Sequence, residues 1–305
     1  MIGQRRVLFL FLDGVGIGPP DPALNPFLNA QLPTLRSLLQ DRLPVLDEDP
    51  PAGPQAVVLP LDATMGVDGL PQSGTGHVAL FTGDNAASLY GRHFGPWVPV
   101  PLRPLLLEKN LLYLAQEAGR SCVFANAYPS QYMYRARTKR PAGPPLIAHS
   151  AGLLTRDETH LARGEAVSSE ILNSAWRTRL GMTHLPEISP HEAGQNLARI
   201  VQDAELTLFA HYFTDTAGHE RTIEAGVAAL ERVDAFLGGL LEELPSETLL
   251  VLASDHGNIE DVTQGHTRNP TFNLLYGPDA IQVTQGLSKI TDLTPALLQY
   301  LNGES

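Results

Sequence analysis

Three apolar runs in this sequence are each followed by a carboxylate. VLFLFLD ends at Asp13, TLFAHYFTD ends at Asp215, and TLLVLASDH ends at Asp255 and His256. Carboxylate and imidazole side chains are ligands for Mn, Zn or Fe. The runs have the composition of buried strands in an α/β sheet. Because open α/β sheets bind ligands beyond the carboxyl ends of their strands, these acids predict a metal site at that edge.

Histidines accompany two of the acids. His219 follows Asp215 by four residues, so one helical turn directs both side chains to the same point, and the glycine before His219 leaves room for close approach. His256 is adjacent to Asp255, and His266 follows eleven residues after Asp255. An isolated D-x-x-x-H pair is usually structural, but the whole set has the oxygen and nitrogen ligands of a two-metal site.

A glycine-rich segment, GLPQSGTGHVALFTG, carries the hydroxyl residues Ser73 and Thr75 immediately before a predicted helix. A hydroxyl at a helix N-terminus lies at the positive end of the helix dipole, where backbone N–H groups can also bind phosphate. The alternative is a helix-capping serine without chemistry. Beside two metal ions the nucleophilic role is favoured, because a metal lowers the pKa of a hydroxyl.

Composition limits the class of protein. The chain has 305 residues and a formal net charge of −12, which disfavours nucleic acid as a partner. Cys122 is the only cysteine, so no internal disulfide forms. The apolar stretch 7–12 is shorter than the roughly 7–15 residues of a signal-peptide core. No run approaches the roughly 20 apolar residues of a membrane span. We expect a cytoplasmic protein that binds neither membranes nor nucleic acid.

Charge is unevenly distributed along the chain. Residues 88–191 contain 12 Lys+Arg and 7 Asp+Glu, whereas the remainder contains 9 and 26. We therefore predict a metal-binding core of residues 1–87 and 192–305 and an inserted α+β cap domain at 88–191. Apolar spacing and turn residues predict helices at 105–119, 190–203 and 222–244, a strand at 121–128 and a loop at 140–145.

The order of the motifs D-G-x-G, S-x-x-G-H, D-x-x-G-H, D-H-G-N and H-T-x-N-P resembles the alkaline phosphatase superfamily. Within it, the chain looks most like 2,3-bisphosphoglycerate-independent phosphoglycerate mutase and phosphopentomutase. The resemblance implies a three-layer α/β core with a mostly parallel sheet, and two divalent metal ions, Mn or Zn. The mutases' D-G-R-D cap signature is absent, so phosphoglycerate specificity does not transfer.

The resemblance also implies roles for individual residues. One metal would be held by Asp215, His219 and His266, and the other by Asp13, Asp255, His256 and the nucleophile Ser73. Ser73 is preferred to Thr75 because it precedes the G-H histidine by four residues, and His77 itself is expected beside the ligands.

A basic stretch in the expected cap, YMYRARTKRP, offers a substrate-binding group. If the stretch is extended, Arg135, Arg137 and Lys139 share one face, and Arg140 follows them. These cations would bind a phosphate or carboxylate. The alternative is a solvated basic edge strand.

The function we predict is phosphoryl transfer on a small phosphorylated metabolite through a phosphoserine, as in the phosphomutases. A closing cap that excludes water favours transfer over hydrolysis. The alternatives are a metal-dependent phosphatase or phosphodiesterase of the nucleotide pyrophosphatase kind, and an inactive binding protein on the same fold. The sulfatase signature is missing around Ser73. The oligomeric state is left open.

Overall fold

The computed structural model describes residues 5–133 and 140–304. One sheet of six strands, in the order β2-β6-β5-β1-β4-β3, forms its centre. Strands β3, β4, β1 and β5 pair in parallel, and β6 is antiparallel to both β5 and β2. The strands are β1 (Arg6–Leu12), β2 (Ala56–Leu61), β3 (Cys122–Phe124), β4 (Leu206–His211), β5 (Thr248–Ala253) and β6 (Thr271–Tyr276). The predicted α/β class with a mostly parallel sheet is confirmed.

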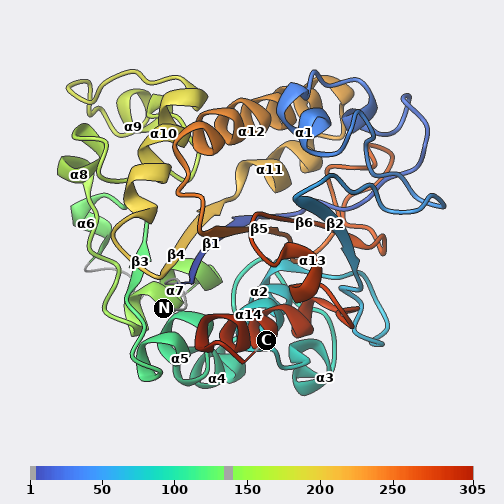
Figure 1. The fold of residues 1–305 in the computed structure, drawn as a ribbon, viewed down its shortest axis with the longest axis horizontal. Coiled ribbons are helices and arrows are strands. Elements are labelled where there is room, and N and C mark those ends of the chain that lie inside the picture. Colours follow the sequence, from blue (N-terminus) through green and yellow to red (C-terminus); the bar gives the residue numbers. More distant parts are fainter. Residues whose placement is uncertain (1–4, 134–139, 305) are drawn as a thin grey trace.

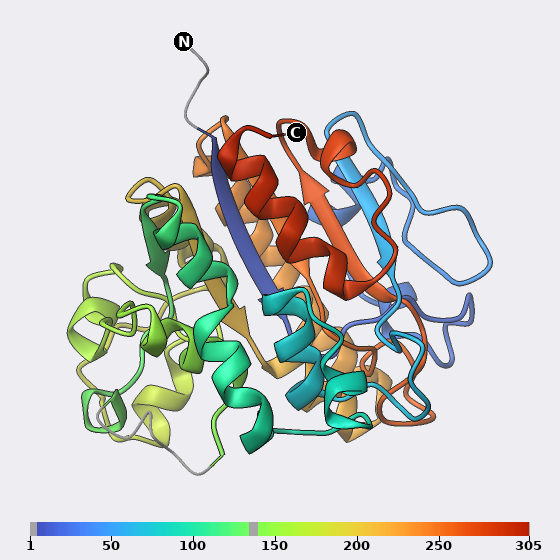
Figure 2. The ribbon, with the colours of Figure 1, turned by 90° about the horizontal axis from the view of Figure 1, so that it is seen from below.

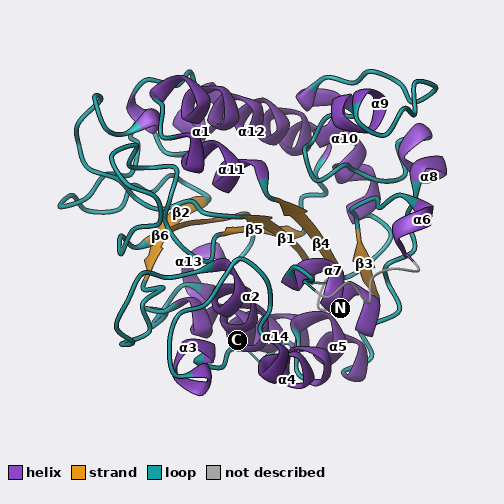
Figure 3. Ribbon diagram, turned by 180° about the vertical axis from the view of Figure 1, so that it is seen from behind, coloured by secondary structure: helices purple, strands orange, loops and turns teal. Residues whose placement is uncertain are grey.

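Helices cover both faces of the sheet, giving three layers (Figures 1 and 3). One face carries η1 (Pro26–Leu28), α1 (Pro33–Leu38), α10 (Pro190–Val201), α11 (Phe213–Glu220) and α12 (Ile223–Glu243). The other carries α2 (Ser73–Thr82), α3 (Ala86–Tyr90), η2 (Val100–Leu102), α4 (Arg103–Glu108), α5 (Leu111–Glu117), α7 (Gly143–Ser150), α13 (Ala280–Val283) and α14 (Ile290–Asn302). In Figure 2 this second face is in front, with α14 in red and α2 in teal.

Strand β1 shows why the sheet is covered on both sides. Its residues alternate between the two hydrophobic cores, with Phe9 and Phe11 on the side of α2 and Leu8 and Leu10 on the side of α12. Side chains of successive strand residues point to opposite faces, so a continuously apolar strand must be buried on both. The sequence of this strand therefore requires a three-layer arrangement.

Helix boundaries follow the predicted ones where capping residues are strong. Helix α10 begins after a capping box in which Ser189 and Glu192 satisfy each other's backbone N–H groups, and Thr222 caps α12. The predicted single helix at 105–119 is wrong, because the side chain of Asn110 accepts a hydrogen bond from Tyr113 N and starts a new helix. The predicted loop at 140–145 runs into α7, whose first turn accommodates proline.

The predicted strand at 121–128 is shorter than expected. Only residues 122–124 pair with β4 as a strand. Beyond them, the side-chain amide of Asn126 donates to Ala210 O and its oxygen accepts from Ala210 N, at 2.7 and 2.8 Å. A side chain thus replaces the backbone ladder at this edge of the sheet.

We propose limits for the inserted domain that differ from the predicted 88 and 191 and follow the packing. Strand β3 belongs to the central sheet, and Leu106, Leu112 and Ile147 pack in the same core as α2 and α14. Charge balance reports the composition of the surface, whereas a domain is defined by its core, so the two need not coincide. A small separate hydrophobic cluster unites Ala127, Leu161, Ala166, Trp176 and Leu185. We propose that the inserted lobe is limited to about residues 126–189.

This lobe contains the short helices α6 (Ser130–Met133), α8 (Glu158–Ala162) and α9 (Ser174–Thr178), which lie together beside β3 in Figure 1. None of the helices in the described part of the chain is long and apolar enough to cross a membrane.

Candidate metal centre

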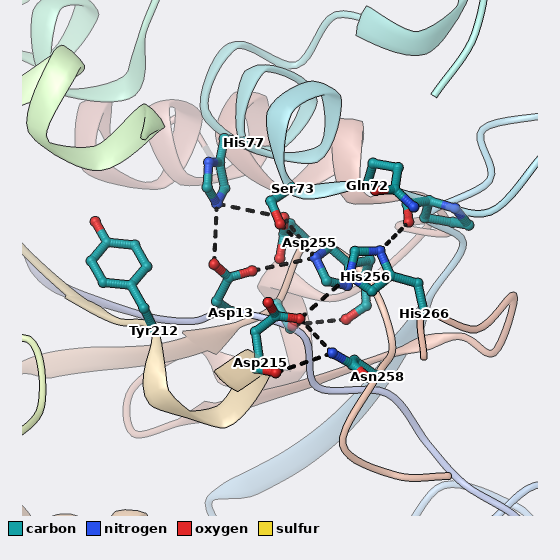
Figure 4. Close-up of polar contacts among 12 residues, drawn as sticks. Asp13, Gln72, Ser73, His77, Tyr212, Asp215, Asp255, His256, Asn258 and His266 are labelled. Atoms are coloured by element: carbon teal, nitrogen blue, oxygen red, sulfur yellow. Dashed lines mark hydrogen bonds and ion pairs between the residues drawn. The ribbon is translucent and has the colours of Figure 1, made fainter. Parts of the chain in front are cut away.

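Three neighbouring parallel strands deliver the acidic side chains to one place. Asp13 directly follows β1, and Asp255 lies two residues beyond β5. Asp215 lies in the first turn of α11, which follows β4. Because β4, β1 and β5 are adjacent and parallel, their carboxyl ends meet at one edge of the sheet. Figure 4 shows the side chains converging there.

The first ligand group consists of Asp215, His219 and His266. His219 Nε2 lies 3.2 Å from Asp215 Oδ2, as expected for residues four apart on α11. His266 Nε2 lies 3.5 Å from Asp215 Oδ1 and 3.4 Å from His219 Nε2. The glycine expected to give room, Gly218, faces Asn258, and a Cβ there would lie 2.6 Å from the amide carbon. The three ligand atoms lie within 4.8 Å of one another.

The second group consists of Asp13, Asp255 and His256, which are all buried. His256 Nε2 lies 3.3 Å from Asp13 Oδ1 and 3.7 Å from Asp255 Oδ2. The imidazole of His256 stacks on that of His266, with ring centroids 4.0 Å apart. The two groups are therefore adjacent.

Ser73 is the first residue of α2, and its hydroxyl joins the second group. Its Oγ lies 2.9 Å from His256 Nε2 (Figure 4). The hydroxyl of Thr75, in contrast, is directed to the backbone oxygens of Gln72 and Phe94 and accepts a hydrogen bond from Phe94 N. The structure therefore brings Ser73 to the ligands and engages Thr75 elsewhere.

Backbone carbonyls orient both buried imidazoles for ligation. His266 Nδ1 donates to Pro71 O at 2.8 Å, and His256 Nδ1 donates to Gly257 O at 3.2 Å. When Nδ1 is the donor, the lone pair of a neutral imidazole is on Nε2. A second hydrogen bond of this kind is the usual support of a metal-binding histidine.

Buried carboxylate oxygens without a hydrogen-bond partner indicate whether metal ions fit this site. Oδ1 of Asp13 and both carboxylate oxygens of Asp255 are buried without a hydrogen-bond partner. Leaving buried carboxylate oxygens unpaired is costly. Divalent cations would satisfy them, and carboxylates with imidazoles suit Mn or Zn. The residues fit two divalent ions, although they do not choose the element.

Buried opposite charges in the second ligand group shift one another's pKa values. Burial raises the pKa of Asp255 to about 7, with His256 opposing the rise. Burial also disfavours a charged His256, but the carboxylates of Asp255 and Asp13 outweigh it and raise the pKa of His256 to about 10. Cationic imidazole thus compensates carboxylate charge that metal ions would otherwise neutralise.

His77 supports the second group from outside. Its Nδ1 accepts the backbone N–H of Gly143 at 3.2 Å, so Nε2 carries the proton. That nitrogen faces Asp255 Oδ2 at 3.6 Å and Asp13 Oδ2 at 3.8 Å. Burial lowers the pKa of His77, but the nearby carboxylates of Asp13 and Asp255 outweigh burial and produce a net rise. His77 therefore turns its N–H toward both carboxylates.

Two residues at the site were not singled out from the sequence. Asn258 donates to Asp215 Oδ1 at 2.6 Å and to Asp215 O at 3.2 Å. Glu260 is completely buried behind the ligand-bearing loops. Asn258 is the last residue of the D-H-G-N motif and Glu260 follows that motif by two residues, a position that is equally typical of a surface loop.

The basic stretch is only partly described. Arg135, Arg137 and Lys139 lie outside the described residues. The guanidinium of Arg140 lies over the Trp97 ring, 4.3 Å from its centroid. The carbonyl of the next residue, Pro141, accepts from Val98 N, and Gly143 contacts His77. The stretch therefore ends close to the metal centre.

Comparison with known proteins identifies relatives of this chain. The Metalloenzyme superfamily matches residues 5–303. A 2,3-bisphosphoglycerate-independent phosphoglycerate mutase of Agrobacterium fabrum is 32% identical over 129 residues, covering 38% of this chain and 25% of that protein. Mutase 2 of Methanosarcina barkeri is 28% identical over 127 residues, covering 38% and 24%. The matched region thus spans only about a quarter of these relatives.

Solved structures resemble the chain over its whole length. The PH0037 protein from Pyrococcus horikoshii superposes with a TM-score of 0.61 and 14% identity, covering 100% of this chain and 98% of that one. The alkaline phosphatase from the Antarctic bacterium TAB5 gives 0.51 and 11% identity, covering 98% of each chain. At such identities the likeness shows a shared fold. The expected family is confirmed, and this chain belongs to the Metalloenzyme superfamily, with an alkaline-phosphatase-like fold.

Proposed function

We propose that this protein is a two-metal phosphoryl-transfer enzyme that acts on a small phosphorylated metabolite through a phosphoserine at Ser73. The observation that carries the proposal is the position of Ser73 Oγ, at the start of α2 and 2.9 Å from His256 Nε2. The hydroxyl thus adjoins both ligand groups, since His256 stacks on His266.

In this proposal the residues of the site have different roles. Asp215, His219 and His266 would hold one divalent ion, and Asp13, Asp255 and His256 the other, with Ser73 beside them. When bound, the ions would supply Lewis-acid stabilisation of charge on the phosphoryl oxygens. Ser73 Oγ loses its proton to solvent and bonds to phosphorus, while the bond from phosphorus to the leaving oxygen breaks and that oxygen takes up a proton from solvent. The positive end of the α2 dipole favours the anionic phosphoryl group at this position.

The organic part of the substrate needs space beside Ser73. Gln72, the preceding residue, lines a hollow of about 480 Å³ together with Asp68, Arg92, His93 and Phe94. We propose that this hollow receives the substrate and that Arg92 binds an anionic or hydroxyl group on it. A clamp for a phosphate or carboxylate formed by Arg135, Arg137, Lys139 and Arg140 remains a further proposal.

The fate of the phosphoseryl group separates two activities. We place phosphomutase first, because curated relatives that match part of this chain are phosphoglycerate mutases. A phosphatase or phosphodiesterase is the second candidate. An inserted lobe limited to about residues 126–189, as proposed above, would favour it by providing less structure to exclude water.

A screen of phosphorylated metabolites with Mn²⁺ and with Zn²⁺ tests the proposal, with both free phosphate and isomerised product measured. Isomerised product without free phosphate supports a mutase, and free phosphate supports a hydrolase. If the metal-loaded protein transfers no phosphoryl group to water, to substrate or to Ser73, the proposal is wrong, and a binding protein on this fold is the better interpretation.

A further inference from the structure

A buried carboxylate outside the two ligand groups joins the loops that carry them. Glu260 lies five residues after Asp255, and its side chain has no exposed surface. Within the described parts of the chain, no lysine, arginine or histidine forms an ion pair with it. A buried carboxylate is costly unless other groups satisfy it. Its surroundings therefore need an account.

Hydrogen-bond donors satisfy both oxygens of Glu260. Oε2 accepts from the backbone N–H groups of Gly16 at 2.9 Å and Asn258 at 2.7 Å. Oε1 accepts from the hydroxyl of Thr267 at 2.5 Å and the amide of Asn269 at 3.1 Å. Hydrogen bonds to an ionised acceptor are about twice as strong as neutral ones. The carboxylate thus fixes four donors around one point.

The donors come from two loops that carry metal-ligand candidates. Gly16 lies in the loop after β1 and follows Asp13 by three residues. Asn258 and Thr267 lie in the β5–β6 loop, which also contains Glu260; there Asn258 follows His256 by two residues and Thr267 is adjacent to His266. The β5–β6 loop therefore carries members of both ligand groups. The approach is close, since a Cβ on Gly16 would overlap the carboxylate of Glu260.

One further bond extends the network to the remaining acid. Asn258, whose backbone is held by Glu260, donates its side-chain amide to Asp215 Oδ1 at 2.6 Å. Glu260 is therefore connected to His266 through the adjacent Thr267, and to Asp215 through Asn258. No other described carboxylate outside the ligand set makes such a connection.

We propose that Glu260 is a positioning residue that couples the two metal pockets. By fixing the loops of Asp13, His256 and His266 relative to one another, it sets the separation of the pockets. An ion in one pocket then favours the loop arrangement that the other pocket needs, so the two ions bind with positive cooperativity. This inference rests on the proposed two-metal centre.

The competing interpretation is that Glu260 only stabilises the fold, and the chain offers a matched control for it. Glu170 is also buried, with 5% exposure, and its carboxylate accepts from Ala175 N at 2.5 Å and Ser174 Oγ at 3.2 Å. It lies in the inserted lobe and touches no metal ligand. Loss of either carboxylate should lower the melting temperature, but only Glu260 should affect metal binding.

Calorimetric titration of the metal-free protein with Mn²⁺ measures both affinities and their coupling. In Glu260→Ala we expect both ions to bind about 10–100-fold more weakly, the usual effect of losing a ligand-supporting group. Glu260→Gln should recover part of the loss, because its carbonyl can still accept the two backbone N–H groups. Glu170→Ala should bind both ions with wild-type affinity despite a lower melting temperature.

Each outcome decides between the interpretations. Wild-type affinities and cooperativity in folded Glu260→Ala would overturn the proposal and leave Glu260 a structural residue. If Glu260→Ala does not fold, Thr267→Val removes one donor at similar volume. It should weaken the pocket of His266 and reduce cooperativity, and unchanged binding would again overturn the proposal. A wild-type chain that binds neither Mn²⁺ nor Zn²⁺ would instead refute the metal centre itself.

Discussion

Ser73 and Thr75 differ in what surrounds their hydroxyls, although the sequence presents them alike. Ser73 Oγ faces His256, whereas the Thr75 hydroxyl bonds to the loop at Phe94. We predict that Ser73→Ala abolishes phosphoenzyme formation and leaves both metal ions bound. Intact-protein mass after exposure to a phosphorylated substrate, with metal analysis of the same sample, measures both. Thr75→Ser, which keeps a hydroxyl, is the control and should still be phosphorylated.

Phosphorylation of Ser73→Ala at wild-type level would assign the nucleophile elsewhere. If the metals were also lost in that variant, Ser73 would be needed to form the pocket, and the assay could not be read as loss of the nucleophile alone.

Asp215 is shared by both imidazoles of the first ligand group. Burial raises the pKa of Asp215. The contacts of its carboxylate with His219, His266 and Asn258 outweigh burial and hold the pKa well below its usual range. We predict that Asp215→Asn weakens the binding of the ion in the first pocket at least about tenfold and has a smaller effect on the affinity of the second pocket. Metal titration compared with Asp255→Asn, which should show the opposite preference, measures this. Global unfolding of Asp215→Asn would instead assign Asp215 a structural role.

At the scale of elements, His211 links the end of β4 to the inserted lobe. Its Nδ1 donates to Ser169 O at 2.8 Å, and its Nε2 is buried without a partner. Burial lowers the pKa of His211 to about 4, below the ordinary value of 6.5. The unfolded chain therefore binds a proton between pH 6.5 and 4 that the folded protein excludes. The stability contributed by neutral His211 is complete above pH 6.5 and is lost as the pH falls.

We predict an acid-dependent loss of stability from this residue, on the order of 3 kcal/mol by about pH 4. His211→Gln can still donate to Ser169 but cannot titrate, so its melting temperature should fall less between about pH 7.5 and pH 5 than that of the wild type. If the melting temperatures of the two proteins fall equally between these pH values, His211 does not cause the loss of stability in acid.

The loop 92–97 is the element that the sequence analysis overlooked. It packs over the first turn of α2, with Thr75 N donating to Phe94 O at 2.9 Å, and carries Arg92 into the hollow beside Gln72. We predict that Arg92→Gln raises KM for a phosphorylated sugar. KM for a small aryl phosphate should not change, because that substrate has no group that reaches Arg92. Arg42→Gln, an exposed arginine in the excursion between α1 and β2, is the control.

The same comparison of substrates tests the basic stretch. Changing Arg135 and Arg137 together to glutamine should also raise KM for the phosphorylated sugar alone. Equal effects on both substrates would contradict a clamp, because a group that recognises a distant part of the substrate cannot affect one that lacks this part.

At the scale of the whole molecule, metal binding and folding should be linked. Ligands from both the first and the last parts of the chain meet at one edge of the sheet, so the pockets exist only in the folded state. We predict that Mn²⁺ or Zn²⁺ at 100 times the dissociation constant raises the free energy of unfolding by about 2.7 kcal/mol per site and so raises the melting temperature. Scanning calorimetry with metal and with chelator measures it. Equal melting temperatures would mean that no ion prefers the folded chain.

The two groups of candidate ligands could be proposed from the sequence because their signals are local. Asp215 and His219 share a helical turn, and Asp13 and Asp255 follow apolar strands. Strand type and helix periodicity depend on neighbouring residues, so these elements were also predictable, as with α10 and α12. The domain limits stay a prediction, because charge along the chain does not record which core a helix joins.

By itself, then, the sequence determined which residues have ligand and nucleophile chemistry and which strands carry them. Only the tertiary structure decided that β3, α4 and α5 join the core, that Ser73 and not Thr75 faces His256, and that Glu260 lies among the ligand loops. The physical reason is that residue type and local spacing fix secondary structure and donor chemistry. Burial, by contrast, depends on contacts between segments far apart in the chain. A glutamate in a loop reads as solvated until the rest of its own loop and the loop after β1 close around it.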